Sequence, residues 1–219
     1  MSAEIEDIRR CFIEAVQGCS RRDDPWRHWL LEDCLPPAVG EALANLPIPV
    51  PRIDDTRGKR ETHNLLRQFF SVENRRRFPV MDQVARAFQS PEVVEALETL
   101  CGVDLSGNYL RIEYCQDTQG FWLEPHTDIG AKKFTMLIGL SKEPEAAAWG
   151  TSIYRDKETF VGNAPFGFDK GLIFIPGDDT WHGFVERPIQ GVRRQIMLNY
   201  VIPEWRSRHE LAFPDQPVS

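Results

Sequence analysis

The feature that most constrains the fold of this chain is a change in residue pattern near position 105. From about residue 106 onward, short runs rich in β-branched and aromatic residues are separated by Gly, Pro and Asp. Runs of this length and composition are typical of β-strands. The predicted strands are Asn108–Cys115, Lys133–Leu140, Thr151–Tyr154, Leu172–Ile175, Trp181–Glu186 and Arg193–Val201. Short strands at this spacing favour two sheets packed face to face, as in a sandwich or jelly roll.

The first 105 residues show helical spacing instead. Residues 91–101 form the clearest predicted helix, because Ser90 is a good N-cap, Pro91 suits the first helical position and Gly102 can end the helix. Apolar residues also recur at helical spacing within 5–16, 37–46 and 79–88, whereas 47–78 look like a long irregular connection. The prediction is an α+β fold, with the N-terminal helices packed on the outside of one sheet.

No linker separates the two halves, so residues 1–219 are expected to form a single domain. Within it we expect a mainly helical N-terminal region (1–105), a jelly-roll catalytic core (106–203) and a C-terminal tail (204–219).

Composition narrows the classes of function. Hydrophobic residues (42%) and charged residues (27%) are near globular averages, which excludes wholesale disorder. A net charge of −7 argues against generic binding to nucleic acid or to an anionic membrane. No apolar run approaches the ~18–20 residues of a membrane span, and the N-terminus lacks the apolar stretch of a secretory signal. The five cysteines include no C-x-x-C pair, so we expect free thiols and a cytoplasmic location, and leave the oligomeric state open.

One set of residues carries chemistry. His126 and Asp128 are two positions apart just before a predicted strand, so in an extended segment both side chains point to the same side. His182 follows a Pro-Gly turn at the start of a later strand and can complete the set if the sheets face each other. Two histidines and one carboxylate on one face of a metal suit non-haem iron(II). The other histidines, His28, His63 and His209, are expected to be structural.

Two adjacent arginines follow these residues along the chain. Arg193 lies 11 residues after His182 and is followed directly by Arg194. An arginine inside a barrel needs a carboxylate partner, because an unpaired buried charge is very costly. A guanidinium can hold a carboxylate through two parallel hydrogen bonds, and an acidic cosubstrate would supply one.

With these motifs in order, residues 106–203 resemble the iron(II)/2-oxoglutarate-dependent dioxygenases. The Pro before His126 and the Gly-x-Arg at 191–193 also resemble the prolyl-hydroxylase-like branch of that superfamily. The resemblance implies a double-stranded β-helix (a jelly roll, cupin-like). It implies that His126, Asp128 and His182 are the catalytic iron ligands. Iron(II), 2-oxoglutarate and O2 are the implied cofactor and cosubstrates.

The resemblance also assigns the cosubstrate contacts. It implies that Arg193 binds the distal carboxylate of 2-oxoglutarate, with Arg194 as its rival. The family often has Arg-x-Ser here, whereas this chain has Gln195, so parity favours Arg193 but the hydroxyl is missing.

Tyr114, on the strand before the metal-binding motif, resembles a tyrosine that often contacts the cosubstrate. Tyr109 and Arg111 share the opposite parity from Tyr114 and are its competitors.

The predicted function is hydroxylation of a small organic or carrier-bound substrate, with release of succinate and CO2. The carboxylate at Asp128 separates this chain from family halogenases, which have a small residue there. Two alternatives stay open: a catalytically silent jelly roll that binds a metal or ligand, and a cupin-like metalloenzyme that does not use 2-oxoglutarate.

Overall fold

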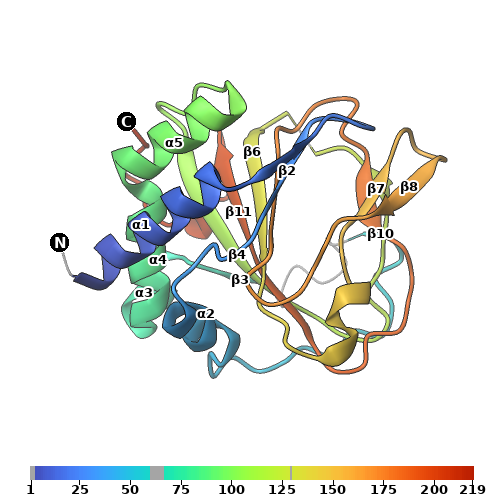
Figure 1. The fold of residues 1–219 in the computed structure, drawn as a ribbon. Coiled ribbons are helices and arrows are strands. Elements are labelled where there is room, and N and C mark those ends of the chain that lie inside the picture. The colour runs from blue at the N-terminus through green and yellow to red at the C-terminus, as the bar shows by residue number, and fades with distance from the viewer. Residues whose placement is uncertain (1–2, 60–66, 129) are drawn as a thin grey trace.

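The computed structural model describes residues 3–59, 67–128 and 130–219, and Figure 1 shows two β-sheets with helices on one side. The α-helices are α1 (Ala3–Gln17), α2 (Pro37–Ala44), α3 (Val72–Arg77), α4 (Pro79–Gln89) and α5 (Pro91–Cys101). The strands are β1 (Ser20–Arg22), β2 (His28–Leu31), β3 (Gln68–Phe69), β4 (Tyr109–Asp117), β5 (Leu123–His126), β6 (Lys132–Gly139), β7 (Ser152–Tyr154), β8 (Phe160–Asn163), β9 (Gly171–Phe174), β10 (His182–Phe184) and β11 (Arg193–Val201). Short 3₁₀ helices are η2 (Pro144–Ala148) and η3 (Arg208–Glu210).

The strands form two antiparallel sheets. The larger has the order β1-β2-β9-β6-β11-β4-β3, and the smaller has the order β5-β10-β7-β8. The two sheets lie opposite each other, with the helices beyond the larger one (Figure 1). This arrangement confirms the predicted α+β jelly roll, and each of the six predicted strands is present within a few residues.

The larger sheet has an apolar outer face and an inner face that mixes polar and apolar side chains. On β11, Ile196, Leu198 and Tyr200 are fully buried in the main hydrophobic cluster, while the alternate positions include Gln195 and Asn199. Because side chains alternate along a strand, the apolar set points to the helices and the polar set points to the space between the sheets. The same strand therefore closes the core and lines the interior.

Helices α1, α4 and α5 cover the outer face, as predicted. Phe12 of α1 stacks on Phe88 of α4 with ring centroids 4.6 Å apart, and both belong to the cluster that includes β11. Tyr200 is fully buried on that face, and its hydroxyl donates to the Phe88 carbonyl oxygen. This bond satisfies the one polar atom that the tyrosine brings into the core.

The start of α5 differs from the prediction in one detail. Ser90 occupies the N-cap position and Pro91 the first turn, but the Ser90 hydroxyl donates to the Ala87 carbonyl oxygen at the end of α4 (2.7 Å). The predicted capping bond is therefore wrong, because the tight α4–α5 junction offers the serine another partner. Gly102 ends the helix in the left-handed region (φ 69°), as expected.

Several short elements were not predicted. The mainly helical region also supplies β1, β2 and β3 to the larger sheet, and α3 to the expected irregular connection. Strands β5 and β8 were also missed. At two to four residues, these strands are too short to show a clear alternation. The segment expected to be a C-terminal tail packs against the rest of the protein, since Leu211 and Ala212 are fully buried.

The cysteines are free, as predicted, at positions 11, 19, 34, 101 and 115. Burial raises the pKa of the Cys34 thiol well above its usual value, so this thiol is not a reactive thiolate. None of the described helices combines the length and apolar character needed to cross a membrane.

The buried carboxyl group of Asp169, away from the space between the two sheets, gives a test of the fold. Asp169 is 8% exposed, has φ 59°, and accepts hydrogen bonds from the Leu35 backbone N–H (3.1 and 3.3 Å). Burial raises the pKa of Asp169 to about 7, and the charge of Asp33 adds to the effect. The folded state thus holds the proton more tightly than the unfolded chain, and this contribution to stability is lost as pH rises from about 4 through about 7.

We expect Asp169→Asn to raise the free energy of unfolding at pH 8 by on the order of 1 kcal/mol, because Asn keeps the acceptor and tolerates the left-handed backbone without the buried charge. Urea denaturation at pH 5 and pH 8 measures the difference, with exposed Asp215→Asn as the control. An equal effect of Asp169→Asn at both pH values would contradict the expected titration.

Candidate metal centre

His126 and His182 face each other across two strands of the smaller sheet. His126 ends β5, His182 begins β10, and the two are register partners with ring centroids 4.5 Å apart. Each Nδ1 lies against a backbone carbonyl oxygen, that of Glu124 for His126 (2.7 Å) and that of Thr180 for His182 (2.9 Å). Because a carbonyl only accepts, each Nδ1 carries the proton and donates it. Both Nε2 lone pairs are then available to a metal.

The local sequence explains how β10 reaches this position. The Thr180 hydroxyl closes the preceding turn by donating to the Gly177 carbonyl oxygen (3.1 Å) and accepting from the Gly177 N–H (3.0 Å). The next strand residue after His182 is Gly183, where an added Cβ would lie 2.8 Å from the Leu123 carbonyl oxygen. Glycine therefore permits the close approach of β10 to β5 that brings the histidines together.

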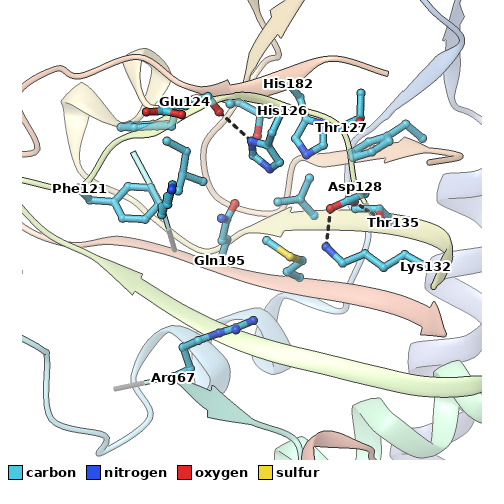
Figure 2. Close-up of a pocket in the computed structure, with 18 of the residues that line it drawn as sticks. Arg67, Phe121, Glu124, His126, Thr127, Asp128, Lys132, Thr135, His182 and Gln195 are labelled. Atoms are coloured by element: carbon cyan, nitrogen blue, oxygen red, sulfur yellow. Dashed lines mark hydrogen bonds and ion pairs between the residues drawn. The ribbon is translucent and has the colours of Figure 1, made fainter. Parts of the chain in front are cut away.

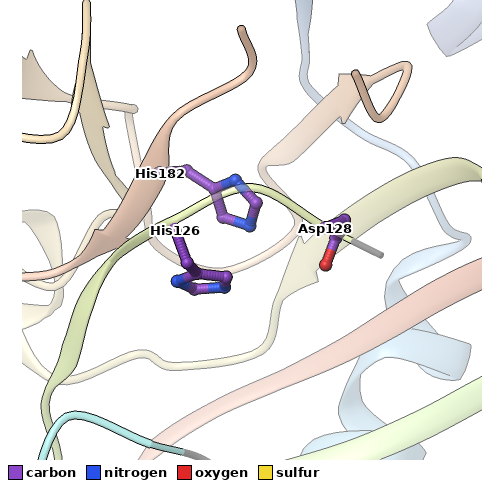
Figure 3. A group of neighbouring side chains, drawn as sticks. All are labelled: His126, Asp128 and His182. Atoms are coloured by element: carbon purple, nitrogen blue, oxygen red, sulfur yellow. The ribbon is translucent and has the colours of Figure 1, made fainter. Parts of the chain in front are cut away.

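Asp128 completes the group from the connection between β5 and β6. One ligand atom from each of His126, Asp128 and His182 lies within 4.8 Å of the others. Figure 3 shows the two rings and the carboxylate directed toward a common space. In the described part of the chain, no other three His, Cys, Asp or Glu side chains meet this condition.

Two neighbours bind the Asp128 carboxylate, whose side chain is only 6% exposed. Lys132 Nζ donates to Oδ1 (2.5 Å) and Thr135 Oγ1 donates to Oδ2 (3.0 Å). Burial alone would raise the pKa of Asp128, but the charges of Lys132 and His182 and these hydrogen bonds lower it overall. Burial also lowers the pKa of His182 to about 4. At neutral pH the centre therefore offers a carboxylate and a neutral imidazole, the forms that ligate metals.

The group opens into a cavity of about 410 Å³ between the two sheets (Figure 2). Apolar side chains, among them Leu137, Phe174 and Phe184, form part of its wall. Its size is within the range of small-molecule sites, and its wall combines apolar side chains with polar and charged groups that can orient a ligand.

Arg193 lines this cavity and is 2% exposed. Its Nη1 donates to Asp117 Oδ2 (2.6 Å), its Nε to the Trp149 carbonyl oxygen (2.7 Å) and its Nη2 to Gln195 Oε1 (3.2 Å). A buried arginine was expected to need a carboxylate, and the expected source was a bound cosubstrate. In the structure Asp117 of the same chain provides a carboxylate, and the contact of Arg193 with a cosubstrate stays a prediction.

Arg193 and Arg194 are adjacent on β11, so their side chains point to opposite faces of the sheet. Arg194 lies on the other face of β11 and does not line the cavity; its Nη1 is 3.9 Å from Glu143. Tyr114 also lies on the outer face, packed in the main hydrophobic cluster with the helices. The expectation that Tyr114 contacts a cosubstrate is thus wrong, because the alternation of β4 turns its ring away from the cavity. Its competitor Arg111 does line the cavity.

Some residues around the cavity were not predicted. Lys132 and Thr135 hold Asp128, and Asp117 holds Arg193. In the sequence, Lys132 is one of two adjacent lysines, and Asp117 lies two residues beyond the predicted strand Asn108–Cys115. Local sequence patterns do not reveal these partners; Asp117 and Arg193, for example, are 76 positions apart.

The remaining histidines lie apart from the centre. His28 is buried in β2, where its Nδ1 contacts the Trp26 carbonyl oxygen (2.9 Å). His209 is exposed in η3 near the C-terminus. His63 lies outside the described residues.

Comparison with known proteins identifies the fold. No family model matches the sequence, and no curated protein matches it. A prolyl 4-hydroxylase structure from Phytophthora capsici aligns with 92% of this chain at 16% identity and a TM-score of 0.61, and this chain spans 66% of its length. A prolyl hydroxylase from Trichoplax adhaerens, in complex with a hypoxia inducible factor peptide fragment, aligns over 90% of both chains at 13% identity and a TM-score of 0.57. A Pseudomonas putida prolyl-4-hydroxylase aligns over 89% of this chain and 92% of its own at 11% identity and a TM-score of 0.54.

At these identities the likeness establishes the fold, which is a prolyl-hydroxylase-like double-stranded β-helix as the resemblance implied.

The contact between Lys132 and Asp128 predicts a measurable effect on metal binding. The ammonium group competes with a divalent cation for Oδ1, so Lys132→Met, which keeps the length and removes the charge, should tighten Mn(II) binding by on the order of tenfold. Titration calorimetry of the purified protein measures this affinity. The adjacent exposed Lys133→Met is the matched control, and unchanged affinity in Lys132→Met would refute the competition.

Proposed function

We propose that this protein is an iron(II)- and 2-oxoglutarate-dependent oxygenase that hydroxylates its substrate and releases succinate and CO2. One observation carries the proposal: His126, Asp128 and His182 bring three ligand atoms within 4.8 Å of one another at the wall of a cavity. The fold, shared with prolyl hydroxylases, supports it independently. These two histidines and one carboxylate would hold an iron(II) ion that also takes the cosubstrate and dioxygen.

When bound, iron(II) with 2-oxoglutarate and dioxygen supplies the oxidation that replaces a substrate C–H bond with C–OH. The protein's own contribution is to hold the three candidate metal ligands in position. The carbonyl oxygens of Glu124 and Thr180 fix the two imidazoles, while Thr135 orients the carboxylate. Arg193, at the cavity wall, is the proposed contact for the distal carboxylate of the cosubstrate.

For the substrate we propose a small organic molecule, free or carrier-bound. A cavity of about 410 Å³ that also takes the cosubstrate leaves room for a compact group. The Trichoplax adhaerens structure holds a peptide fragment, so a prolyl peptide is the comparison to test. Succinate release measured across pools of small acids, amino acids, sugars and prolyl peptides separates these classes, and stimulation by peptides alone would overturn the small-molecule assignment.

We also infer that residues 1–219 act as one domain in the cytoplasm. Strands β1, β2 and β3 of the first 105 residues complete the larger sheet of the jelly roll, which supports one folding unit. Five free cysteines support a reducing compartment.

The ligand assignment predicts the behaviour of three variants. His126→Ala, Asp128→Ala and His182→Ala should each lose at least about a hundredfold in iron(II)-dependent conversion of 2-oxoglutarate to succinate, because each removes one ligand atom. Anaerobic addition of iron(II) and then 2-oxoglutarate should give a new visible absorption band in the wild type only. Full turnover by Asp128→Ala, without added halide or carboxylate, would exclude the proposed metal site.

Two alternatives predict different results. A catalytically silent jelly roll would bind metal but show no spectral change with 2-oxoglutarate. A cupin-like metalloenzyme that does not use 2-oxoglutarate is favoured by one observation, the pairing of Arg193 with Asp117.

Arg193→Ala distinguishes this second alternative. Under the main proposal it should raise the KM for 2-oxoglutarate at least about tenfold, because the buried Asp117 charge, no longer opposed by Arg193, would repel the distal carboxylate. Under the alternative, activity toward the true substrate should not change. Steady-state kinetics on folded protein, checked by circular dichroism, measures the difference.

A further inference from the structure

The buried and half-buried cations that line the cavity each have a carboxylate partner within the described residues. These ion pairs are Arg67–Glu113 (2.6 Å), Arg111–Glu210 (2.6 Å), Lys132–Asp128 (2.5 Å) and Arg193–Asp117 (2.6 Å). Their charges cancel in pairs, so the cavity wall is close to electroneutral where it is buried. A ligand carboxylate therefore meets an already paired cation at each of these positions.

The pair of Arg193 and Asp117 is the most enclosed of these, with both side chains 2% exposed. The two residues are register partners at the ends of β11 and β4. At this depth a charge is weakly screened by solvent, so the Asp117 charge acts on anything that approaches Arg193. A second carboxylate at Arg193 would be attracted by the guanidinium and repelled by Asp117.

Asp117 is not needed to orient the guanidinium. The Trp149 carbonyl oxygen and Gln195 accept from two of its nitrogens, and the rings of Phe166 and Phe184 lie 4.7 Å from its central carbon. These contacts fix the plane and the position of the group. The main contribution of Asp117 is thus its charge.

We propose that Asp117 determines cosubstrate specificity by cancelling the charge of Arg193, so that the site discriminates weakly between 2-oxo acids with and without a distal carboxylate. The inference rests on the proposed function, because it assumes that a 2-oxo acid binds at the metal and extends toward Arg193. It assigns to the site a cosubstrate class broader than 2-oxoglutarate: 2-oxo acids whose far end is carboxylate or uncharged.

The test compares 2-oxoglutarate with 2-oxopentanoate, which has the same length without the distal carboxylate. Binding to the iron(II)-loaded protein is measured anaerobically by calorimetry for the wild type and for Asp117→Asn. Asn keeps an oxygen that accepts from Arg193 and removes the charge. The wild type should bind the two acids within about threefold, and Asp117→Asn should prefer 2-oxoglutarate by at least about tenfold.

Asp82→Asn is the matched control. Asp82 lies on α4, does not line the cavity and pairs with Arg75 and Arg86 instead of Arg193. The substitution removes one ion-paired carboxylate away from the site and should leave the preference within about twofold of the wild-type value. An equal gain in both variants would attribute the effect to net charge and overturn the specific role of Asp117.

Further outcomes complete the test. A wild type that already prefers 2-oxoglutarate a hundredfold, or an unchanged preference in Asp117→Asn, overturns the inference. If Asp117→Asn does not fold, the double variant Asp117→Asn/Arg193→Gln removes both charges of the pair and should retain the weak wild-type preference for 2-oxoglutarate. A preference clearly weaker than that of the wild type overturns the inference. Iron binding without binding of either oxo acid by the wild type would instead show that the proposed function fails.

Discussion

The pairing of β11 with β4 is the constraint on which the rest of this structure depends. The two strands align over nine residues, from Arg193 opposite Asp117 to Val201 opposite Tyr109. A shift by one residue would turn every side chain of β11 to the opposite face. Ile196, Leu198 and Tyr200 would then leave the helical core, and Arg193 would leave the cavity. One register thus sets both the hydrophobic core and the charged end of the site.

The smaller sheet has the corresponding role for the metal centre. His126 and His182 become neighbours because β5 and β10 pair with these two residues opposite each other. The close approach at Gly183 and the turn closed by Thr180 are local features that support this pairing. Since the histidines stand on strands and only Asp128 stands on a connection, the ligand set is largely preorganised. The cavity lies between the two sheets, and both the metal centre and Arg193 line it.

Charge within the cavity is balanced locally. Lys132 pairs with the buried Asp128 carboxylate, and Arg193 pairs with Asp117 deep inside the protein. Buried pairs of this kind avoid the high cost of a lone buried charge, and they also fix the electrostatic environment that a ligand meets. The acidic net charge of the whole chain has little influence on these groups, because it is spread over a solvated surface.

The sequence by itself determined the elements whose signals are local. The alternation in Arg193–Val201, the Pro and Gly at the ends of the 91–101 helix and the spacing of His126 and Asp128 predicted the jelly roll, its helical cover and the three candidate ligands. Only the tertiary structure decided that Tyr114 faces the helices, that β1, β2 and β3 extend the larger sheet, and that Asp117 pairs with Arg193. The physical reason is that periodicity acts over a few neighbouring residues, whereas a charge pair or a strand pairing joins residues that are distant in sequence and depends on the complete fold.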